Sequence, residues 1–189
     1  MHANELLNQI GNQTLPPVLL FGPGKAPFQK EAWEPLLAER TVERIIDTYV
    51  DPSMRDMALG VFHADEAKIG DIVLEAQTLP FLVERRVIVV RNADRYNAMS
   101  GEKKSPLYPL IGYLENPSES TIFILITSKI DKRKKFYKAC LKAGAVVECP
   151  QLDDGALSQW IRAEVGNLNK EINGSAINEL IHRGGSRLG

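Results

Sequence analysis

A glycine-rich motif near the N-terminus has the residue types that bind phosphate. The sequence GPGK at residues 22–25 follows an apolar stretch, and a glycine-rich turn into a helix presents amide groups and a favourable dipole to an anion. A Walker A loop needs a glycine, four further residues and then Gly-Lys-Ser/Thr; counted from Gly22, those last positions hold Pro27, Phe28 and Gln29. They offer no hydroxyl to Mg²⁺, and a proline has no amide hydrogen to donate. We therefore interpret the motif as a turn from a strand into a helix, with loose phosphate binding by Lys25 as the alternative.

A second segment lies where a P-loop ATPase carries its carboxylates. Residues 87–90 are a continuous β-branched run, which predicts a parallel strand covered on both faces. In an ATPase the strand in this role would end in Asp-Glu, one carboxylate holding the Mg²⁺ shell and the other orienting the attacking water. Here those places hold Arg91 and Asn92, and an arginine cannot coordinate a cation. We therefore expect no catalytic residue, no cofactor and no metal site in this chain. An active nucleotide-dependent P-loop ATPase of unfamiliar sequence is the alternative.

Composition argues against several other classes of protein. The 189 residues carry a net charge of −1, so no overall basic field recruits nucleic acid. The N-terminus lacks a signal-peptide pattern and no run approaches the ~20 apolar residues that span a bilayer, so we expect a soluble, cytoplasmic protein that contacts no membrane. Cys140 and Cys149 have no CxxC spacing, which predicts reduced thiols rather than a disulfide or a zinc site. The scattered positions of His2, His63 and His182 argue against a catalytic triad.

The first 150 residues alternate between strand and helix patterns. We expect strands at residues 18–21, 41–50, 87–90, 122–126 and 146–147. We expect helices at residues 4–10, 29–37, 65–76, 107–114 and 131–143, the last capped by Asp131, and a mobile surface loop at residues 94–106. Strands that alternate with short helices imply right-handed crossovers. The predicted fold is therefore α/β, a doubly wound parallel sheet of about five strands.

The pattern changes after Pro150, where only helices are expected, at residues 156–165 and 175–181. Such a shift in composition is typical of a domain boundary. We therefore predict an α/β domain without catalytic residues at 1–150 and the beginning of a small helical domain at 151–189.

A strongly basic run could contact DNA or another protein. Lys132, Arg133, Lys134 and Lys135 are consecutive, and each could contact a phosphate in a salt-dependent way. The run lacks the interleaved aromatic residues on which single-strand binders stack bases. A solvated or partner-facing surface is therefore favoured over a DNA-binding regulator.

A short apolar segment lies between a predicted helix and the strand at 87–90. Leu79, Phe81 and Leu82 cannot all point inward from a short loop, and Pro80 restricts the local backbone. We therefore expect at least one large apolar side chain to face solvent, which is typical of a protein-binding surface. Ordinary burial under the preceding helix is the alternative, and the residues by themselves do not separate the two.

Two segments carry a resemblance to a known family. The chain resembles, over nearly its whole length, the delta subunit of bacterial DNA polymerase III, which is part of the clamp loader. The most specific segments are TLPFLVERRVIVVRNAD at 78–94 and KIDKRKKFYK at 129–138. The resemblance implies a P-loop-like domain of the AAA+ type without ATPase residues, then a small helical domain and a C-terminal collar. It also implies that Leu79, Pro80, Phe81 and Leu82 insert into a pocket on the ring-shaped sliding clamp and help open the ring for loading onto primed DNA during replication.

The sequence departs from this family in two places. The turn at residues 22–27 is longer than the short Gly-x-x-Pro form common in the family, and the chain stops at GGSRLG, where the family continues into another helix. We therefore expect an N-terminal fragment that ends inside the second domain. The partners implied are the sliding clamp, the other loader subunits through a region absent here, and primed DNA in the assembled complex.

Overall fold

A computed structural model of the chain describes residues 1–26 and 29–184. Its centre is a five-stranded sheet in the order β4-β5-β6-β1-β7, and every pair of neighbouring strands is parallel. The strands are β1 (Val18–Gly22), β4 (Leu59–His63), β5 (Arg86–Arg91), β6 (Thr121–Ile126) and β7 (Ala145–Glu148). The predicted α/β fold with a parallel sheet of about five strands is confirmed.

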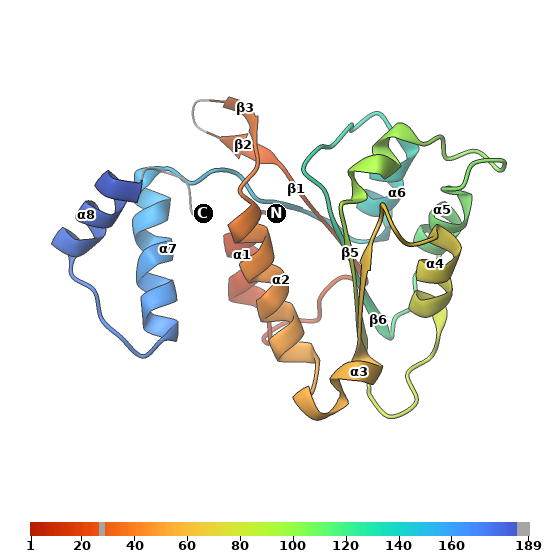
Figure 1. Cartoon of the computed structure of the whole chain (residues 1–189), viewed down its shortest axis with the longest axis horizontal. Helices are drawn as coiled ribbons and strands as arrows, with labels where there is room; N and C mark the ends of the chain where they lie inside the picture. The colour runs from red at the N-terminus through yellow and green to blue at the C-terminus, as the bar shows by residue number, and fades with distance from the viewer. Residues whose placement is uncertain (27–28, 185–189) are drawn as a thin grey trace.

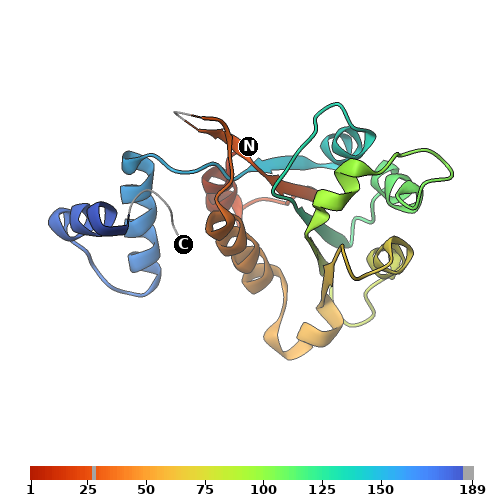
Figure 2. The ribbon, with the colours of Figure 1, turned by 45° about the horizontal axis from the view of Figure 1, so that its top comes forward.

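Helices cover both faces of this sheet (Figures 1 and 2). One face packs against α1 (Ala3–Gln9) and α2 (Pro35–Tyr49). The other packs against α4 (Ile69–Gln77), α5 (Tyr108–Glu115) and α6 (Lys135–Ala143). Because β1 and β6 lie inside the sheet and are covered on both faces, every residue of these two strands is buried. That burial explains why their sequences are continuous apolar runs.

The structure corrects the prediction for residues 29–50. β2 (Gly24–Ala26) and β3 (Gln29–Ala32) form a hairpin, so the helix expected at 29–37 is correct only for residues 35–37, which begin α2. The strand expected at 41–50 is wrong, because α2 extends to Tyr49. Pro35 begins α2 instead of bending an earlier helix, which is the place in a helix that proline favours. The buried residues Val42, Ile45 and Ile46 have the spacing of a helix face, and this spacing outweighs the apparent alternation.

The second strand of the sheet lies at a place the sequence did not indicate. It is β4, which follows η1 (Pro52–Met54) and α3 (Arg55–Ala58) and forms one edge of the sheet. An edge strand is only partly buried, so β4 lacks the long apolar run that marks β5 and β6. β4 packs closely on β5 at Gly60, since a Cβ there would come within 2.8 Å of the Ile88 side chain.

Smaller corrections concern the ends of helices. The helix expected at 65–76 begins only at Ile69, and part of the loop expected at 94–106 is the 3₁₀ helix η2 (Ala93–Ala98). The basic helix begins at Lys135 with Lys134 as its N-cap, because the Asp131 carboxylate accepts a hydrogen bond from the Arg133 amide and closes a separate turn. The helix expected at 107–114 is confirmed as α5, and the fifth strand as β7.

The C-terminal part of the described chain is helical, as predicted, with α7 (Asp154–Asn167) and α8 (Gly174–Gly184). Asp153 caps α7 by accepting a hydrogen bond from the Ala156 amide at 2.8 Å. Leu152 and Leu157 join the core that α1 and α2 form with the sheet. The boundary predicted at residue 150 stays a prediction. Within the described ranges, no helix is long and apolar enough to cross a membrane.

Candidate functional site

The GPGK motif leads into a hairpin and not into a helix. Strand β1 ends at Gly22, and Lys25 lies exposed in β2 of the hairpin. The interpretation of the motif as a strand-to-helix turn is therefore wrong, while Pro27 and Phe28 lie outside the described residues. A Cβ on Gly24 would come within 2.8 Å of the Glu148 Cβ, so close packing against the end of β7 explains this glycine. A phosphate bound here would not face the amide groups of a helix N-terminus.

Arg91 and Asn92, at the end of β5, both bind neighbouring side chains. The Arg91 guanidinium forms an ion pair with the Glu39 carboxylate of α2. Asn92 has a left-handed backbone, with φ 57°, and its amide donates to the Asp65 carboxylate at 3.3 Å. Hydrogen bonds from the Asp65 backbone amide and from Asn92 lower the pKa of the Asp65 carboxyl. Arg91 thus joins α2 to the sheet.

The two cysteines lie apart in the two cores. Cys149 belongs to the core on the α1 and α2 face, and Cys140 to the core on the α6 face, and both are free thiols. Burial raises the pKa of both thiols, and the Glu34 carboxylate adds to the shift at Cys149. The geometry gives both of them a packing role.

The apolar segment between α4 and β5 is strongly exposed. Leu79 is 76%, Phe81 93% and Leu82 56% exposed, while Pro80 is half-buried. The prediction that at least one large apolar side chain faces solvent is confirmed, and burial under the preceding helix is wrong for these three residues. We refer to residues 78–85 as the apolar loop.

Hydrogen bonds hold both ends of the apolar loop. At its start, Thr78 donates from its amide and its hydroxyl to the Leu74 carbonyl, at 3.0 and 2.8 Å. At its end, the Arg86 amide donates to the Ser120 carbonyl at 2.9 Å, which joins the chain to the sheet. The exposed side chains are therefore carried by a loop between two fixed elements.

The structure adds two exposed apolar residues that the sequence reasoning missed. Leu74 is 68% exposed on α4, one turn before Thr78. It falls outside the buried stripe of that helix, which comprises Ile69, Ile72, Val73 and Ala76, and this departure from helical spacing was the available signal. Met57 of α3 is also exposed. Because α3 leads into β4 and β4 pairs with β5 in parallel, α3 and the apolar loop lie at the same end of the sheet, where both strands begin (Figure 1).

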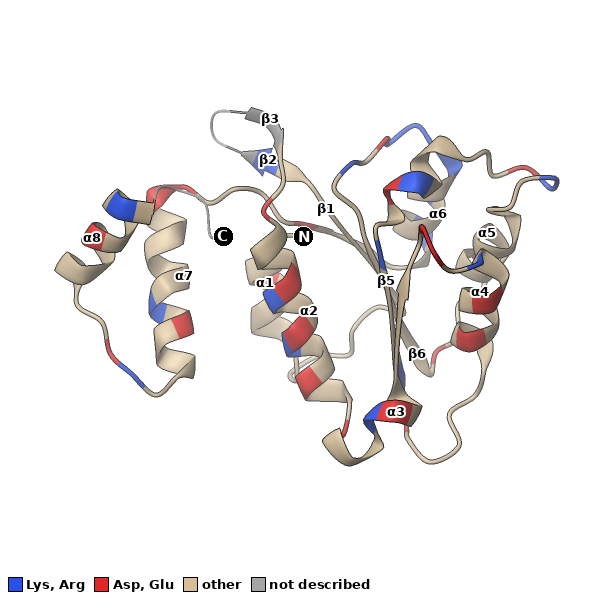
Figure 3. Ribbon diagram, in the orientation of Figure 1, with Lys and Arg blue, Asp and Glu red and all other residues tan. Residues whose placement is uncertain are grey.

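The basic run lies at the opposite end of the sheet, where the strands end. The apolar loop precedes β5, whereas Lys132, Arg133, Lys134 and Lys135 follow β6, so parallel strands place the two at opposite ends (Figure 3). Arg133 donates twice to the Asp131 carboxylate, at 2.9 Å each, which lowers the pKa of Asp131 to about 2. The Lys135 ammonium donates to the Gly101 carbonyl at 3.2 Å. The side chains of Lys132 and Lys134 are exposed.

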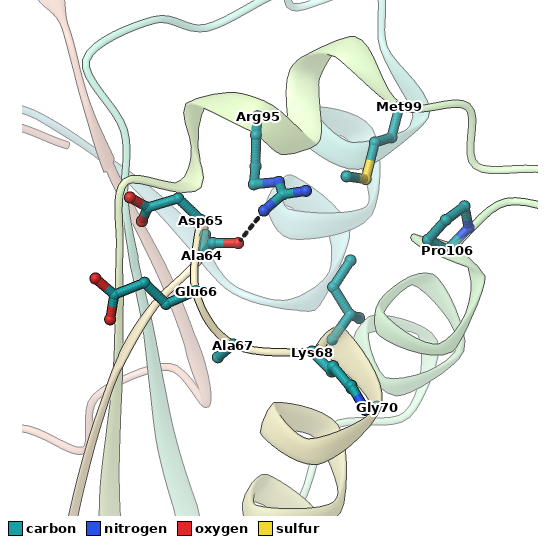
Figure 4. A pocket seen from close by; sticks show the side chains of 10 residues that line it. Ala64, Asp65, Glu66, Ala67, Lys68, Gly70, Arg95, Met99 and Pro106 are labelled. Atoms are coloured by element: carbon teal, nitrogen blue, oxygen red, sulfur yellow. Dashed lines mark hydrogen bonds between the residues drawn. The ribbon is translucent and has the colours of Figure 1, made fainter.

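A hollow of about 400 Å³ lies between the N-terminus of α4 and η2 (Figure 4). The turn at residues 64–70 lines one side of it, and Arg95, Met99 and Pro106 line the other. The Arg95 guanidinium donates to the Ala64 carbonyl at 2.8 Å across this hollow. It lies at the carboxyl edge of β4, and none of the site residues predicted from the sequence lines it.

The fold is that of an α/β protein of the P-loop type. A RuvB structure from Thermotoga maritima aligns with 97% of this chain and 55% of its own, with a TM-score of 0.51 and 18% sequence identity. At that identity the likeness concerns the fold alone.

The family follows from the sequence comparison. Residues 33–150, well over half of the chain, match the family model described as DNA polymerase III, delta subunit. The chain belongs to this family.

Two relatives from Bacillus subtilis agree with this assignment. DNA polymerase III subunit delta of strain 168 is 34% identical over 127 residues, which cover 64% of this chain and 36% of that protein. The solved structure of the B. subtilis DNA clamp loader delta protein aligns with a TM-score of 0.73 and 26% identity, covering 95% of this chain and 51% of that one. The chain therefore spans about half the length of the solved relative and about a third of the length of the curated one.

Proposed function

We propose that this chain binds the ring-shaped sliding clamp through Leu79, Pro80, Phe81 and Leu82 and helps open the ring for loading onto primed DNA. The observation that carries the proposal is Phe81, a phenylalanine that is 93% exposed on a loop whose ends are hydrogen bonded. A cluster of large apolar side chains in water is a common mark of a protein interface. Membership in the delta-subunit family supports the clamp as the partner.

The energy of such a contact comes mainly from the aromatic side chain. Phe81 loses its exposed apolar surface when it enters a pocket, and Leu79 and Leu82 exclude water around it. Truncating an anchor of this kind costs about 2 kcal/mol or more, which is about a thirtyfold loss of affinity.

Opening of the ring requires a difference in affinity. A ligand shifts an equilibrium between closed and open rings only by as much as it prefers one of them. In this proposal the apolar loop fits a pocket that is better formed in the open ring, so binding and opening are coupled without a chemical step in this chain. ATP turnover is then the task of other loader subunits.

The remaining contacts belong to the assembled loader. In this proposal the basic run orients the chain against another subunit or DNA; it comprises Lys132, Arg133, Lys134 and Lys135. Residues 1–150 form the P-loop-like domain, and residues 151–189 begin a helical one. Arg133 and Lys135 already bind Asp131 and Gly101, which supports orientation over tight DNA binding. Salt-dependent DNA affinity of the isolated chain would instead favour a DNA-binding regulator.

The test compares two exposed apolar residues. Phe81→Ala is expected to weaken binding to the sliding clamp of the same organism at least thirtyfold with little change in the thermal midpoint. Leu168→Ala is the matched control, because Leu168 is 71% exposed at the end of α7, far from the apolar loop in sequence. Unchanged clamp affinity in Phe81→Ala would refute the proposal, as would a collapse of the melting transition, which would make Phe81 structural.

A further inference from the structure

We propose that Arg86 is a positioning residue for Phe81, which holds the last turn of α4 and the start of β5 in one geometry and so sets the direction of the apolar loop. This inference rests on the proposed function, because it concerns how the same loop reaches its partner. Arg86 does not itself face that partner, since its side chain is only 9% exposed.

The last carbonyls of a helix have no partner within the helix. In α4 these carbonyls bind residues from three different segments. The Leu74 carbonyl accepts from Thr78 of the apolar loop, at 3.0 and 2.8 Å. The Glu75 carbonyl accepts from the Arg86 guanidinium at 3.2 Å, and the Ala76 carbonyl accepts from the Thr121 hydroxyl at 2.9 Å. The end of α4 is thereby attached to two strands of the sheet.

Arg86 joins both ends of the apolar loop at once. Its guanidinium also pairs with the Glu75 carboxylate, so a single side chain binds the backbone and the side chain of Glu75. Its own amide donates to the Ser120 carbonyl, and in the sheet it pairs with Thr121, the residue that binds Ala76. The residue that begins β5 therefore also binds the last turn of α4.

The buried charge of Arg86 is paired with Glu75. An arginine is almost never fully buried unless it is paired, because removing the charge from water is costly. Here the buried guanidinium lies where the apolar loop leaves α4 and returns to the sheet. A loop held in its binding geometry loses less conformational freedom on association, which raises affinity without any added contact.

The experiment measures clamp affinity together with local hydrogen exchange in the full chain. Arg86→Met keeps much of the side-chain volume but removes the donors, and we expect about tenfold weaker binding with faster amide exchange confined to residues 78–85. Thr121→Val should act in the same direction by about threefold, while Thr121→Ser, which keeps the hydroxyl, should restore both readouts.

A remote destabilising variant separates positioning from stability. Val147→Ala removes buried methyl groups from β7, at the other edge of the sheet, so it lowers stability without touching the apolar loop. If it weakened clamp binding as much as Arg86→Met did, the role of Arg86 would be merely structural and the inference overturned. Phe81→Ala separates the remaining outcomes. If Phe81→Ala lost clamp binding while Arg86→Met and Thr121→Val bound the clamp normally, only this inference would fail. If Phe81→Ala bound the clamp normally, both the proposed function and this inference would fail.

Discussion

Arg91 and Glu39 form an ion pair between the carboxyl end of β5 and α2, at a place where a P-loop ATPase needs free carboxylates. The pair gives the arginine a structural partner. The GPGK motif, at the end of β1, leads into a hairpin, and close packing against Glu148 explains its Gly24.

We predict from this pair that the chain neither hydrolyses ATP nor binds it with useful affinity. Mg²⁺ would lack carboxylate and hydroxyl ligands, and the transferred phosphoryl group would lack its electrostatic partners. Calorimetric titration with ATP and Mg²⁺ tests the prediction. Micromolar binding accompanied by turnover above background would favour the alternative of an active ATPase.

Leu74 extends the proposed clamp contact onto α4. Because this leucine is exposed one turn before the apolar loop, Leu74→Ala should weaken clamp binding by about threefold to tenfold and leave the free energy of unfolding within about 0.5 kcal/mol of its original value. Leu141→Ala is the matched control, an exposed leucine on α6. Equal affinities in the two variants would restrict the contact to the loop.

The basic run should not contribute to clamp binding. Lys134 and Lys135 follow β6, whereas the apolar loop precedes β5, so they lie at opposite ends of the parallel strands. The double change to Ala is therefore expected to leave clamp affinity unchanged. Phe81→Ala serves as the positive control in the same titration. A tenfold or greater loss in the lysine variant, with the fold intact, would contradict the opposite placement of the two surfaces.

Two glycines offer a test of the fold itself. A Cβ on Gly144 would come within 1.9 Å of the Val18 carbonyl oxygen, so Gly144→Ala should force backbone movement between α6 and β1 and destabilise the protein by about 3 kcal/mol or more. A Cβ on Gly112 meets nothing within 4 Å, so Gly112→Ala in α5 should stabilise the protein by about 0.5–1 kcal/mol. Urea titration of both variants measures these changes, and equal effects would mean that α6 and β1 approach less closely.

The sequence by itself determined the buried strands and left the exposure of the loop between two alternatives. Residues 87–90 and 122–126 could be predicted because a strand covered on both faces must be apolar throughout, whatever its neighbours are. The residues at 78–82 favoured exposure of at least one large apolar side chain, because a short loop cannot bury three of them, but they did not say which; Phe81 is the most exposed. The resemblance to the delta-subunit family rested on residues 78–94 and 129–138, and the family match confirms it.

The tertiary structure alone decided which segment completes the sheet and what holds the loop. An edge strand such as β4 is identified by the hydrogen bonds it makes to β5, and those bonds join residues that are far apart in the sequence. Likewise, the sequence shows Arg86 as one cation among several, and only the folded chain brings it to the Glu75 carbonyl and carboxylate. Local patterns report burial because burial acts on each residue separately, whereas pairing depends on two segments that the chain brings together only when it folds.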